Sequence, residues 1–271
     1  MFQLSACADM IFTSLPYLDR IAAIHDAGFG VEAWRPWECQ PDGIVRLGIP
    51  IVSMQGYVHG GLATPEEGDR MVATARELIP LAHRLGCATL VIHGGELGEG
   101  GAVLTPRHQD TPQMWLAAVE TLGRLAELGE REGVTYCLEN LNRRVDHPGA
   151  PFATTDATRP LVSQVGSPAL RMMLDLYHAQ EDEGHLIETM RAVGPLIGEV
   201  QVADVPGRCE PGTGEARWEA VAAALDTAGY TGRVGLEAYA AGDPHTALDR
   251  FRAAFTPGAA TSGATGAISN Q

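Results

Sequence analysis

The sequence contains no lysine, and all 19 of its basic residues are arginine. A lysine is required to form a Schiff base with a carbonyl substrate or with pyridoxal phosphate. A lysine is also required in the phosphate-binding P-loop of nucleotide hydrolases. The absence therefore excludes lysine-dependent aldolases, pyridoxal enzymes and P-loop enzymes.

Positive charge, paired cysteines and long apolar runs are also scarce. The net charge of −15 opposes contact with a phosphate backbone, so we expect no nucleic-acid partner. The five cysteines form no CxxC pair, which favours reduced, mostly buried thiols over zinc sites or disulfides. Apolar runs such as Ala220–Leu225 are too short for a membrane span, and Met1–Ser5 lacks the pattern of a secretory signal. We therefore expect a cytoplasmic protein without membrane association.

Short β-type runs alternate with longer amphipathic segments along the 271 residues. This alternation predicts a single-domain α/β protein, a (β/α)₈ TIM barrel over residues 1–256. A doubly wound open sheet is the alternative, but it usually has fewer strands and an early glycine-rich phosphate loop. Residues 257–271 are rich in Gly, Ala, Ser and Thr, and we expect a disordered C-terminal tail there. The expected strands are Gln3–Cys7, Gly30–Trp34, Ile51–Gln55, Thr89–His93, Thr135–Glu139, Arg171–Asp175, Gly198–Ala203 and Val234–Ala238, and the clearest helices are Glu66–Leu85, Gln113–Glu132, Glu183–Ala192 and Arg217–Ala228.

Capping residues support two of these helix boundaries. Thr64, Pro65 and the two glutamates that follow are typical of a helix start, with a side-chain cap and acids at the positive end. Gly86 follows the same helix and precedes a strand, where a left-handed residue is needed. Residues 64–86 are therefore expected to be one capped helix.

Four expected strands in succession end in polar residues. In a barrel of this kind the active site forms at the C-terminal ends of the strands, so these side chains are expected to converge. Carboxylates that lie close together cannot all stay ionised unless a cation compensates them. Oxygen ligands suit Mg²⁺ or Mn²⁺ better than zinc, although capping of the following helix is an alternative for each acid alone. The sequence thus predicts one divalent metal ion held by Glu139, Asp175, Gln201 and Glu237.

Two of these residues, Glu139 and Glu237, are expected to face each other across the metal. Such a pair suits proton transfer next to a carbonyl group, in which one glutamate removes a proton and the other returns one. The metal would stabilise the enediolate oxygens between the two steps. Attack by a metal-bound water would use the same ligands, so the residues alone leave the reaction class open.

The chain resembles the hydroxypyruvate isomerase family, which belongs to the xylose isomerase-like barrels. The resemblance extends to about Phe255, and its most specific element is the Pro-Gly-Thr-Gly-Glu loop. The motifs that carry it are Leu4–Ala6, Met10–Phe12, the stretch from Ala27 to Glu32, Leu138–Asn142, Asp175–Gln180, Ala203–Glu215 and Gly235–Glu237.

The resemblance implies a metal-dependent isomerase of carbohydrate metabolism. Such an enzyme would interconvert aldose and ketose forms of a small hydroxy-carbonyl acid or sugar, such as hydroxypyruvate and tartronate semialdehyde. Proton transfer would pass through a metal-bound enediolate, with Glu139 and Glu237 as catalytic acid and base and with the four predicted ligands holding the metal. The resemblance also implies that His178 binds a substrate oxygen and that Arg208 and Glu210 orient the substrate or order the rim.

Several positions depart from the family pattern, notably Gln55–Tyr57, Arg143-Arg144 and Ala238-Tyr239. The exact substrate is therefore left open. Arg143, with Arg35 and Arg144, is a candidate clamp for an anion, although surface arginines of an acidic protein are the alternative.

Two further residues are candidates for substrate binding. Trp34 is a candidate for stacking on substrate, with rim packing as the alternative. His93 closes the fourth expected strand and is a candidate for lining the pocket, with a satisfied core histidine as the alternative.

Three functions remain to be separated. An isomerase is the leading hypothesis, and a ketose 3-epimerase or polyol dehydratase would use the same metal site. A barrel that binds partners without catalysis is the alternative of another class. The partner expected for the enzyme is a small hydroxy-carbonyl molecule, and the sequence leaves open whether the chain forms a homo-oligomer.

Overall fold

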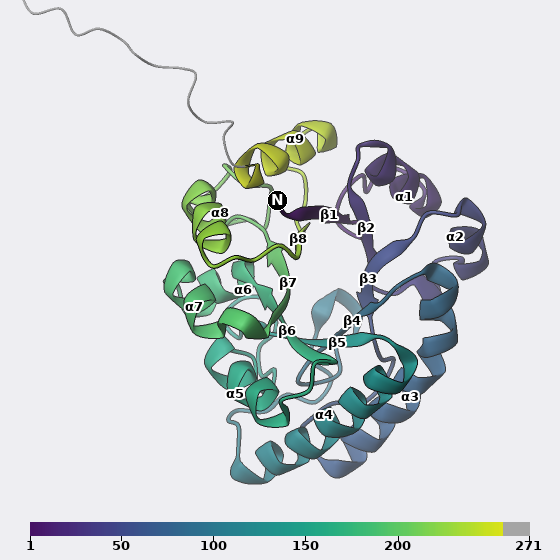
Figure 1. The fold of residues 1–271 in the computed structure, drawn as a ribbon, viewed down its shortest axis with the longest axis vertical. Coiled ribbons are helices and arrows are strands. Elements are labelled where there is room, and N and C mark those ends of the chain that lie inside the picture. The colour runs from purple at the N-terminus through teal and green to yellow at the C-terminus, as the bar shows by residue number, and fades with distance from the viewer. Residues whose placement is uncertain (257–271) are drawn as a thin grey trace, which may run out of the picture.

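The computed structural model describes residues 1–256 and shows a closed barrel of eight parallel strands, as predicted. The strands pair in chain order, and the last pairs with the first (Figure 1). The predicted disordered tail, residues 257–271, lies outside the described residues. The strands are β1 Gln3–Cys7, β2 Gly30–Ala33, β3 Ile51–Gln55, β4 Thr89–Ile92, β5 Thr135–Glu139, β6 Leu170–Asp175, β7 Ile197–Val202 and β8 Arg233–Leu236.

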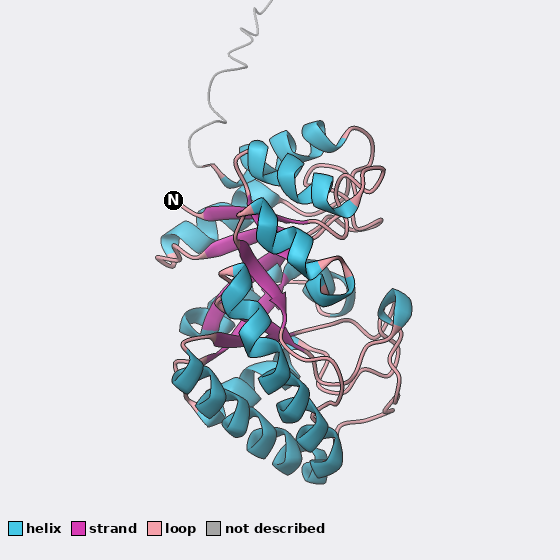
Figure 2. Ribbon diagram, turned by 90° about the vertical axis from the view of Figure 1, so that its right-hand side faces the viewer, coloured by secondary structure: helices cyan, strands magenta, loops and turns pink. Residues whose placement is uncertain are grey.

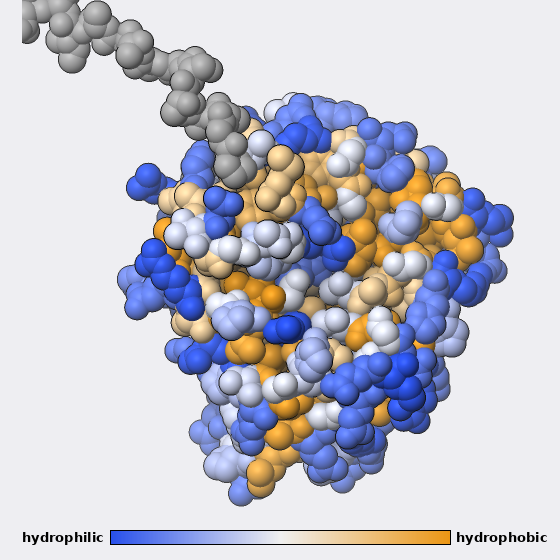
Figure 3. Space-filling model, viewed as in Figure 1, coloured by the Kyte–Doolittle hydropathy of each residue, from blue (hydrophilic) through white to orange (hydrophobic). Residues whose placement is uncertain are grey.

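Helices surround the barrel and bury their apolar faces against it (Figure 1). Figure 3 shows the result on one face, where hydrophilic residues lie mainly around the margin and hydrophobic residues lie further in. None of the helices within residues 1–256 has the length and apolar character needed to span a membrane. The helices are α1 Tyr17–Asp26, α2 Pro41–Leu47, α3 Pro65–Leu85, α4 Pro112–Glu132, α5 Thr155–Val165, α6 Leu176–Asp182, α7 Leu186–Val193, α8 Trp218–Thr227 and α9 Pro244–Phe255, with short 3-10 turns at Pro36–Glu38, Glu99–Gly101 and Gly194–Leu196.

The capping prediction for α3 is confirmed. The side chain of Thr64 accepts a hydrogen bond from the Glu67 amide, Pro65 is the first helical residue, and Gly86 ends the helix with φ of 68°. Glycine tolerates this left-handed conformation because it has no Cβ.

The predicted helix Glu183–Ala192 is present as α7, but it begins three residues later than predicted. The preceding helix α6 ends at Asp182, and α7 begins at Leu186. Gly184 and His185 both have positive φ, 69° and 50°, which is incompatible with a continuous right-handed helix. The helical segment is therefore interrupted here and divided into two short helices.

The loops that leave the C-terminal ends of the strands are the longest. Figure 2 shows them on the side of the barrel away from the N-terminus. The barrel interior below them is unusually polar, because the buried side chains there include Ser5, Glu32, Ser53, Glu199 and Gln201. The fold thus places polar chemistry both at one rim and within the barrel.

Candidate active site

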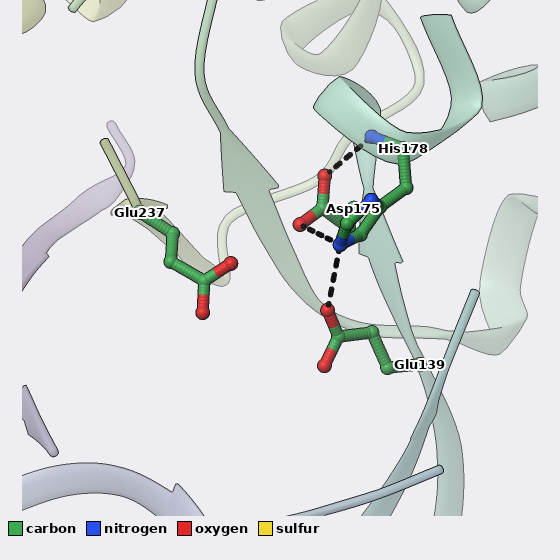
Figure 4. A group of neighbouring side chains, drawn as sticks. All are labelled: Glu139, Asp175, His178 and Glu237. Carbon is green, nitrogen blue, oxygen red and sulfur yellow. Dashed lines mark hydrogen bonds and ion pairs between the residues drawn. The ribbon is translucent and has the colours of Figure 1, made fainter. Parts of the chain in front are cut away.

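Three of the predicted ligands converge at the C-terminal rim of the barrel. Glu139 ends β5, Asp175 ends β6, and Glu237 directly follows β8. Together with His178 they offer ligand atoms that all lie within 4.8 Å of one another, and all four residues are buried. Figure 4 shows Glu237 on the side opposite Asp175 and His178, with its carboxylate pointing toward them.

The gathered carboxylates have perturbed proton affinities. Burial raises the pKa of Glu139 well above its ordinary value, and the charge of Glu237 raises it further. The same two causes, in the same order, raise the pKa of Asp175. A cation among these groups would favour their ionised forms, because opposite charge lowers a carboxyl pKa.

The fourth predicted ligand, Gln201, lies inside the barrel on β7 and is 2% exposed. It pairs in register with Asp175, so the two side chains are neighbours on the inner surface. Its Nε2 donates to Glu32 Oε2 at 2.6 Å, whereas its buried Oε1 has no hydrogen-bond partner among the described residues. A buried amide oxygen without a partner is rare and costly, and a metal ion would satisfy it. The three carboxylates and this oxygen therefore fit a divalent cation that prefers oxygen ligands.

The hydrogen bonds of His178 indicate which of its ring nitrogens carries the proton, and so whether it can ligate a metal. Asn142 Oδ1 accepts from the backbone amides of Val145 and Asp146 at 3.0 and 2.9 Å, which identifies the other terminal atom as Nδ2. Nδ2 then contacts His178 Nδ1 at 2.7 Å, and since Nδ2 can only donate, Nδ1 must accept.

The proton of the neutral ring consequently sits on Nε2. This atom lies 3.8 Å from Glu139 Oε1 and 3.7 Å from Asp175 Oδ2. Burial, followed by the charge of Arg208, lowers the pKa of His178 well below its ordinary value, so the ring stays neutral. A nitrogen that carries a proton cannot ligate a metal, and this geometry favours His178 as a hydrogen-bond donor to substrate.

Glu237 is held by two donors. Trp34 Nε1 donates to its Oε1 and Arg208 Nη2 donates to its Oε2, each at 2.6 Å. Arg208 also lies over the ring of Tyr177, 4.7 Å from the centroid. Although burial opposes the charge of Arg208, the surrounding carboxylates, Glu237 first, raise its pKa. These contacts fix the direction of the Glu237 carboxylate.

Glu139 is oriented by the predicted pocket residue His93. His93 directly follows β4, and its Nε2 lies 3.1 Å from Glu139 Oε2. Its Nδ1 lies 3.0 Å from the hydroxyl of Tyr57, which also donates to the Gly95 carbonyl. Burial lowers the pKa of His93 to about 4, so the ring is neutral near pH 7. Each of the two glutamates thus has its own supporting contacts.

The rim encloses a cavity of about 850 Å³ that opens to solvent. The predicted substrate residues Trp34, His93, His178 and Arg208 line it, as do the carboxylates Glu139 and Glu237. Trp34 is 39% exposed and lies at the mouth. A cavity of this size has room for a small sugar or hydroxy acid beside a metal ion.

The signature loop after β7 is organised by Asp204. The Asp204 carboxylate accepts from the amides of Val205, Gly212 and Ala216 at 2.9 to 3.1 Å. A side chain at Gly214 would collide with the Val205 carbonyl. Asp204 and Gly214 therefore have a structural role: they allow the loop to fold so that Arg208 contacts Glu237.

Two predicted substrate-binding residues lie outside the cavity lining. Arg143 donates to both carboxylate oxygens of Asp110 at 3.0 Å and to the Ala150 carbonyl at 2.7 Å. Glu210 accepts from Arg250 and from the Ala241 amide, each at 2.9 Å. Both side chains are occupied by loop contacts, so their geometry does not favour direct contact with substrate. For Glu210 it favours the other predicted role, which is ordering the rim.

The other two arginines of the predicted clamp do line the cavity. Arg35 donates to the Leu97 carbonyl at 2.6 Å, and Arg144 donates to Glu181 at 2.9 Å. A clamp of all three arginines is therefore not formed.

Several site residues were missed by sequence reasoning. Glu32, Asp146 and His147 line the cavity, and Asn142 lies behind His178. Glu32 belongs to a motif that carries the resemblance, and a lone acid within an apolar strand was a usable signal. His147 and Asp146 lie in a loop whose path the sequence does not reveal.

Comparison with known proteins finds a matching family model and similar proteins that are named as isomerases. A family model described as xylose isomerase-like TIM barrel matches residues 42–255. A putative hydroxypyruvate isomerase of Streptomyces coelicolor is 32% identical over 87% of this chain and 90% of its own length. A 2-oxo-tetronate isomerase of Pectobacterium atrosepticum is 28% identical over 88% of this chain and 92% of its own length.

A solved structure shows the same architecture. The crystal structure named AP endonuclease, family 2, from Brucella melitensis has a TM-score of 0.77 and 28% identity, and the match covers 92% of this chain and 97% of that chain. The similarity therefore extends over most of both chains.

Proposed function

Because the chain belongs to the xylose isomerase-like TIM barrel family, as its resemblance to hydroxypyruvate isomerases predicted, we propose that it is a metal-dependent isomerase. It interconverts the aldehyde and ketone forms of a short hydroxy acid, with hydroxypyruvate and 2-oxo-tetronate as the first candidates, since two relatives are named for these compounds. The observation that carries the proposal is the pair Glu139 and Glu237, whose carboxylates face one another within one group of potential ligands (Figure 4).

The two glutamates are proposed to move the proton. One removes a proton from the hydroxyl-bearing carbon of the substrate, and the other delivers a proton to the neighbouring carbonyl carbon. With hydroxypyruvate this transfer between carbons is accompanied by movement of the hydroxyl proton from the CH₂OH oxygen to the ketone oxygen. Together the two transfers convert the terminal CH₂OH group into an aldehyde and the ketone into a CHOH group. Burial, followed by the charge of Glu237, raises the pKa of Glu139, and perturbed pKa values of this kind are typical of groups that transfer protons.

Glu139, Asp175, Gln201 and Glu237 are proposed to hold one Mg²⁺ or Mn²⁺ ion. When bound, the ion supplies a positive charge that stabilises negative charge on substrate oxygens. His178 donates a hydrogen bond from Nε2 to a substrate oxygen, and Arg208 orients both Glu237 and the substrate. Trp34 and the rim loops line the cavity in which the substrate would bind.

The alternatives differ in where the proton goes. A ketose 3-epimerase would return the proton to the carbon it came from, on the opposite face, and a polyol dehydratase would lose water. A nucleic-acid substrate is opposed by the net charge of −15, although one structural relative is named an AP endonuclease. A non-catalytic role would leave the buried, costly carboxylate group without a purpose.

The proposal is tested by following each candidate acid in D₂O by NMR, with Mn²⁺ or Mg²⁺ and with a chelator. We expect metal-dependent formation of the isomer, with deuterium at the carbon that receives the proton. Deuterium only at the carbon that lost the proton would indicate epimerisation instead. No exchange with any short hydroxy-carbonyl acid or ketose would contradict the proposal.

Variants then assign the proton transfer. Glu139→Gln and Glu237→Gln are each expected to slow turnover by roughly 10²–10⁴-fold, the usual contribution of a general acid or base. Glu199→Gln is the matched control, because Glu199 is a buried barrel glutamate that contacts Ser53 and Arg233 rather than the ligand group. Equal losses in all three variants would point to barrel damage rather than lost catalysis.

A further inference from the structure

We propose that Glu32 is a positioning residue that holds the amide of Gln201 with its oxygen turned to the metal site. Glu32 would thereby set the affinity for the ion without touching it. The inference rests on the proposed function, because it assumes that a divalent ion occupies the site.

The contacts of Glu32 fix the orientation of the amide. Glu32 lies on β2 inside the barrel and is 4% exposed. Its Oε2 accepts from Gln201 Nε2 at 2.6 Å, and its Oε1 accepts from Ser5 Oγ at 2.5 Å. Ser5 Oγ donates to one oxygen of this carboxyl group and the amide nitrogen of Gln201 donates to the other, so the atom of Gln201 that faces Glu32 is the nitrogen. The oxygen of the same amide is therefore directed away from Glu32.

The side-chain oxygen of Gln201 is free to ligate a metal ion. Oε1 is buried and has no hydrogen-bond partner among the residues that the structure describes. Its neighbour in register is Asp175, whose carboxylate belongs to the group of potential ligands. Pinning Nε2 thus leaves Oε1 available on the side of that group.

Gly235 gives independent support. It pairs in register with Gln201 on one side and with Ser5 on the other. A Cβ at this position would collide with Glu32 Oε1 and would lie 2.5 Å from Gln201 Oε1. Only a residue without a side chain leaves room for the carboxylate of Glu32 to reach across to the amide. The glycine is therefore explained by the Glu32–Gln201 contact.

Such a contact affects the ligand in two physical ways. A hydrogen bond from the amide nitrogen to a carboxylate polarises the amide and increases the negative charge on its oxygen. It also removes the alternative orientation in which the nitrogen would face the cation. Loss of outer contacts of this kind typically weakens metal affinity by roughly 10–100-fold.

The test is calorimetric titration of the metal-free protein with Mn²⁺. We expect Glu32→Leu to bind Mn²⁺ roughly 10–100-fold more weakly than the unmodified protein. Glu32→Gln is expected to stay within a few-fold of the unmodified protein, because its carbonyl oxygen can still accept from Gln201 Nε2. Glu199→Leu is the matched control: it removes a buried barrel glutamate bonded to Ser53, and we expect no change in affinity.

Folding is checked by thermal unfolding of each variant in chelator. If Glu32→Leu does not fold, Gly235→Ala replaces it in the comparison, since its added methyl group displaces the same contact and is expected to weaken Mn²⁺ binding similarly. Unchanged affinity in Glu32→Leu or Gly235→Ala would overturn the inference. Equal loss in Glu32→Gln and Glu32→Leu would also overturn it, because charge rather than position would then matter.

The outcome for the unmodified protein separates this inference from its premise. If that protein binds neither Mn²⁺ nor Mg²⁺, the proposed metal-dependent function fails, and the inference fails with it. If it binds the ion and Glu32→Leu binds the ion equally tightly, the proposed function stands and the positioning role alone is rejected.

Discussion

At the scale of single residues, the site depends on atoms whose roles are set by their neighbours. Asn142 is an example, because two backbone donors fix its oxygen and thereby direct its nitrogen at His178. The histidine is left with its proton on Nε2, the atom nearer to Glu139 and Asp175. The neutral imidazole thus presents an N–H group near the two carboxylates, as the proposed role of His178 requires.

The variant Asn142→Asp tests this tautomer. It keeps an oxygen for the backbone donors but cannot donate to His178 Nδ1, so the ring proton is expected to move to Nδ1. We expect kcat to fall by roughly 10²-fold with a smaller change in KM, since a donor needed during reaction is lost. Nitrogen NMR of the histidine side chains reports the tautomer directly.

A double variant serves as the control. Asn142→Asp combined with Asp146→Asn restores the hydrogen bond between positions 142 and 146, with residue 146 now as the donor. No donor to His178 Nδ1 is restored, so the kcat of the double variant should remain low. If Asn142→Asp leaves both the tautomer and kcat unchanged, the assignment of His178 as a donor is wrong.

The sequence predicted some of these residues and could not predict others. Strand ends converge in every barrel of this kind, so placing Glu139, Asp175 and Glu237 at the ends of predicted strands was sufficient to bring them together. Arg143 lies outside the cavity lining and pairs with Asp110 on a distant loop, and no local sequence pattern predicts that pairing. Glu32 was named only as part of a motif, and its proposed role could not be predicted because it depends on a hydrogen bond across the barrel from Gln201.

At the scale of elements, the segment between β7 and α8 connects the fold to the site. Asp204 accepts hydrogen bonds from amides within the loop. Glu210 accepts hydrogen bonds from Ala241, which follows β8, and from Arg250 of α9, and so connects the loop to both segments. Arg208 is thereby held against Glu237. Sequence reasoning recognised this loop by its Gly and Pro pattern, but the anchoring of Glu210 needed the tertiary contacts.

Glu210→Ala is expected to loosen this loop. The loss of two hydrogen bonds from a side chain that is 3% exposed should lower the free energy of unfolding by about 1–3 kcal/mol. Because Arg208 becomes less well placed, KM should rise several-fold while the metal affinity changes little. Denaturant unfolding and steady-state kinetics measure the two effects.

Asp69→Ala is the matched control for an ion pair. The Asp69 side chain is 69% exposed and pairs with Arg124 on the helix surface, so its loss should cost less than about 1 kcal/mol. KM should not change. A Glu210→Ala protein with the kinetics of the Asp69→Ala protein would show that the loop does not depend on Glu210.

At the scale of the whole molecule, the buried carboxylates make the stability of the metal-free protein depend on pH. Glu139 and Asp175 have folded pKa values raised above their ordinary values of 4.5 and 3.8. Their contribution to the stability of the metal-free protein is therefore fully present below those ordinary values and is lost as pH rises through the folded pKa. His93 and His178 have lowered pKa values, so they act in the opposite sense and destabilise the fold as pH falls below 6.5.

A divalent ion should offset the loss of stability at high pH, because it binds the ionised carboxylates and competes with protons for them. We expect Mn²⁺ to raise the Tm more at pH 8 than at pH 5.5, relative to the protein in chelator. Thermal unfolding with and without the ion at both values measures the difference. An equal or larger increase at pH 5.5 would be inconsistent with carboxylate ligands.

The most direct test of the central claim is a crystal structure with Mn²⁺ and its anomalous difference map. The predicted result is a single strong peak at about 2.0–2.3 Å from oxygen atoms of Glu139, Asp175 and Glu237 and from Oε1 of Gln201, with Nε2 of Gln201 on Glu32. The claim would be contradicted by the absence of such a peak, or by an ion bound to Nε2 of His178 with Gln201 turned away.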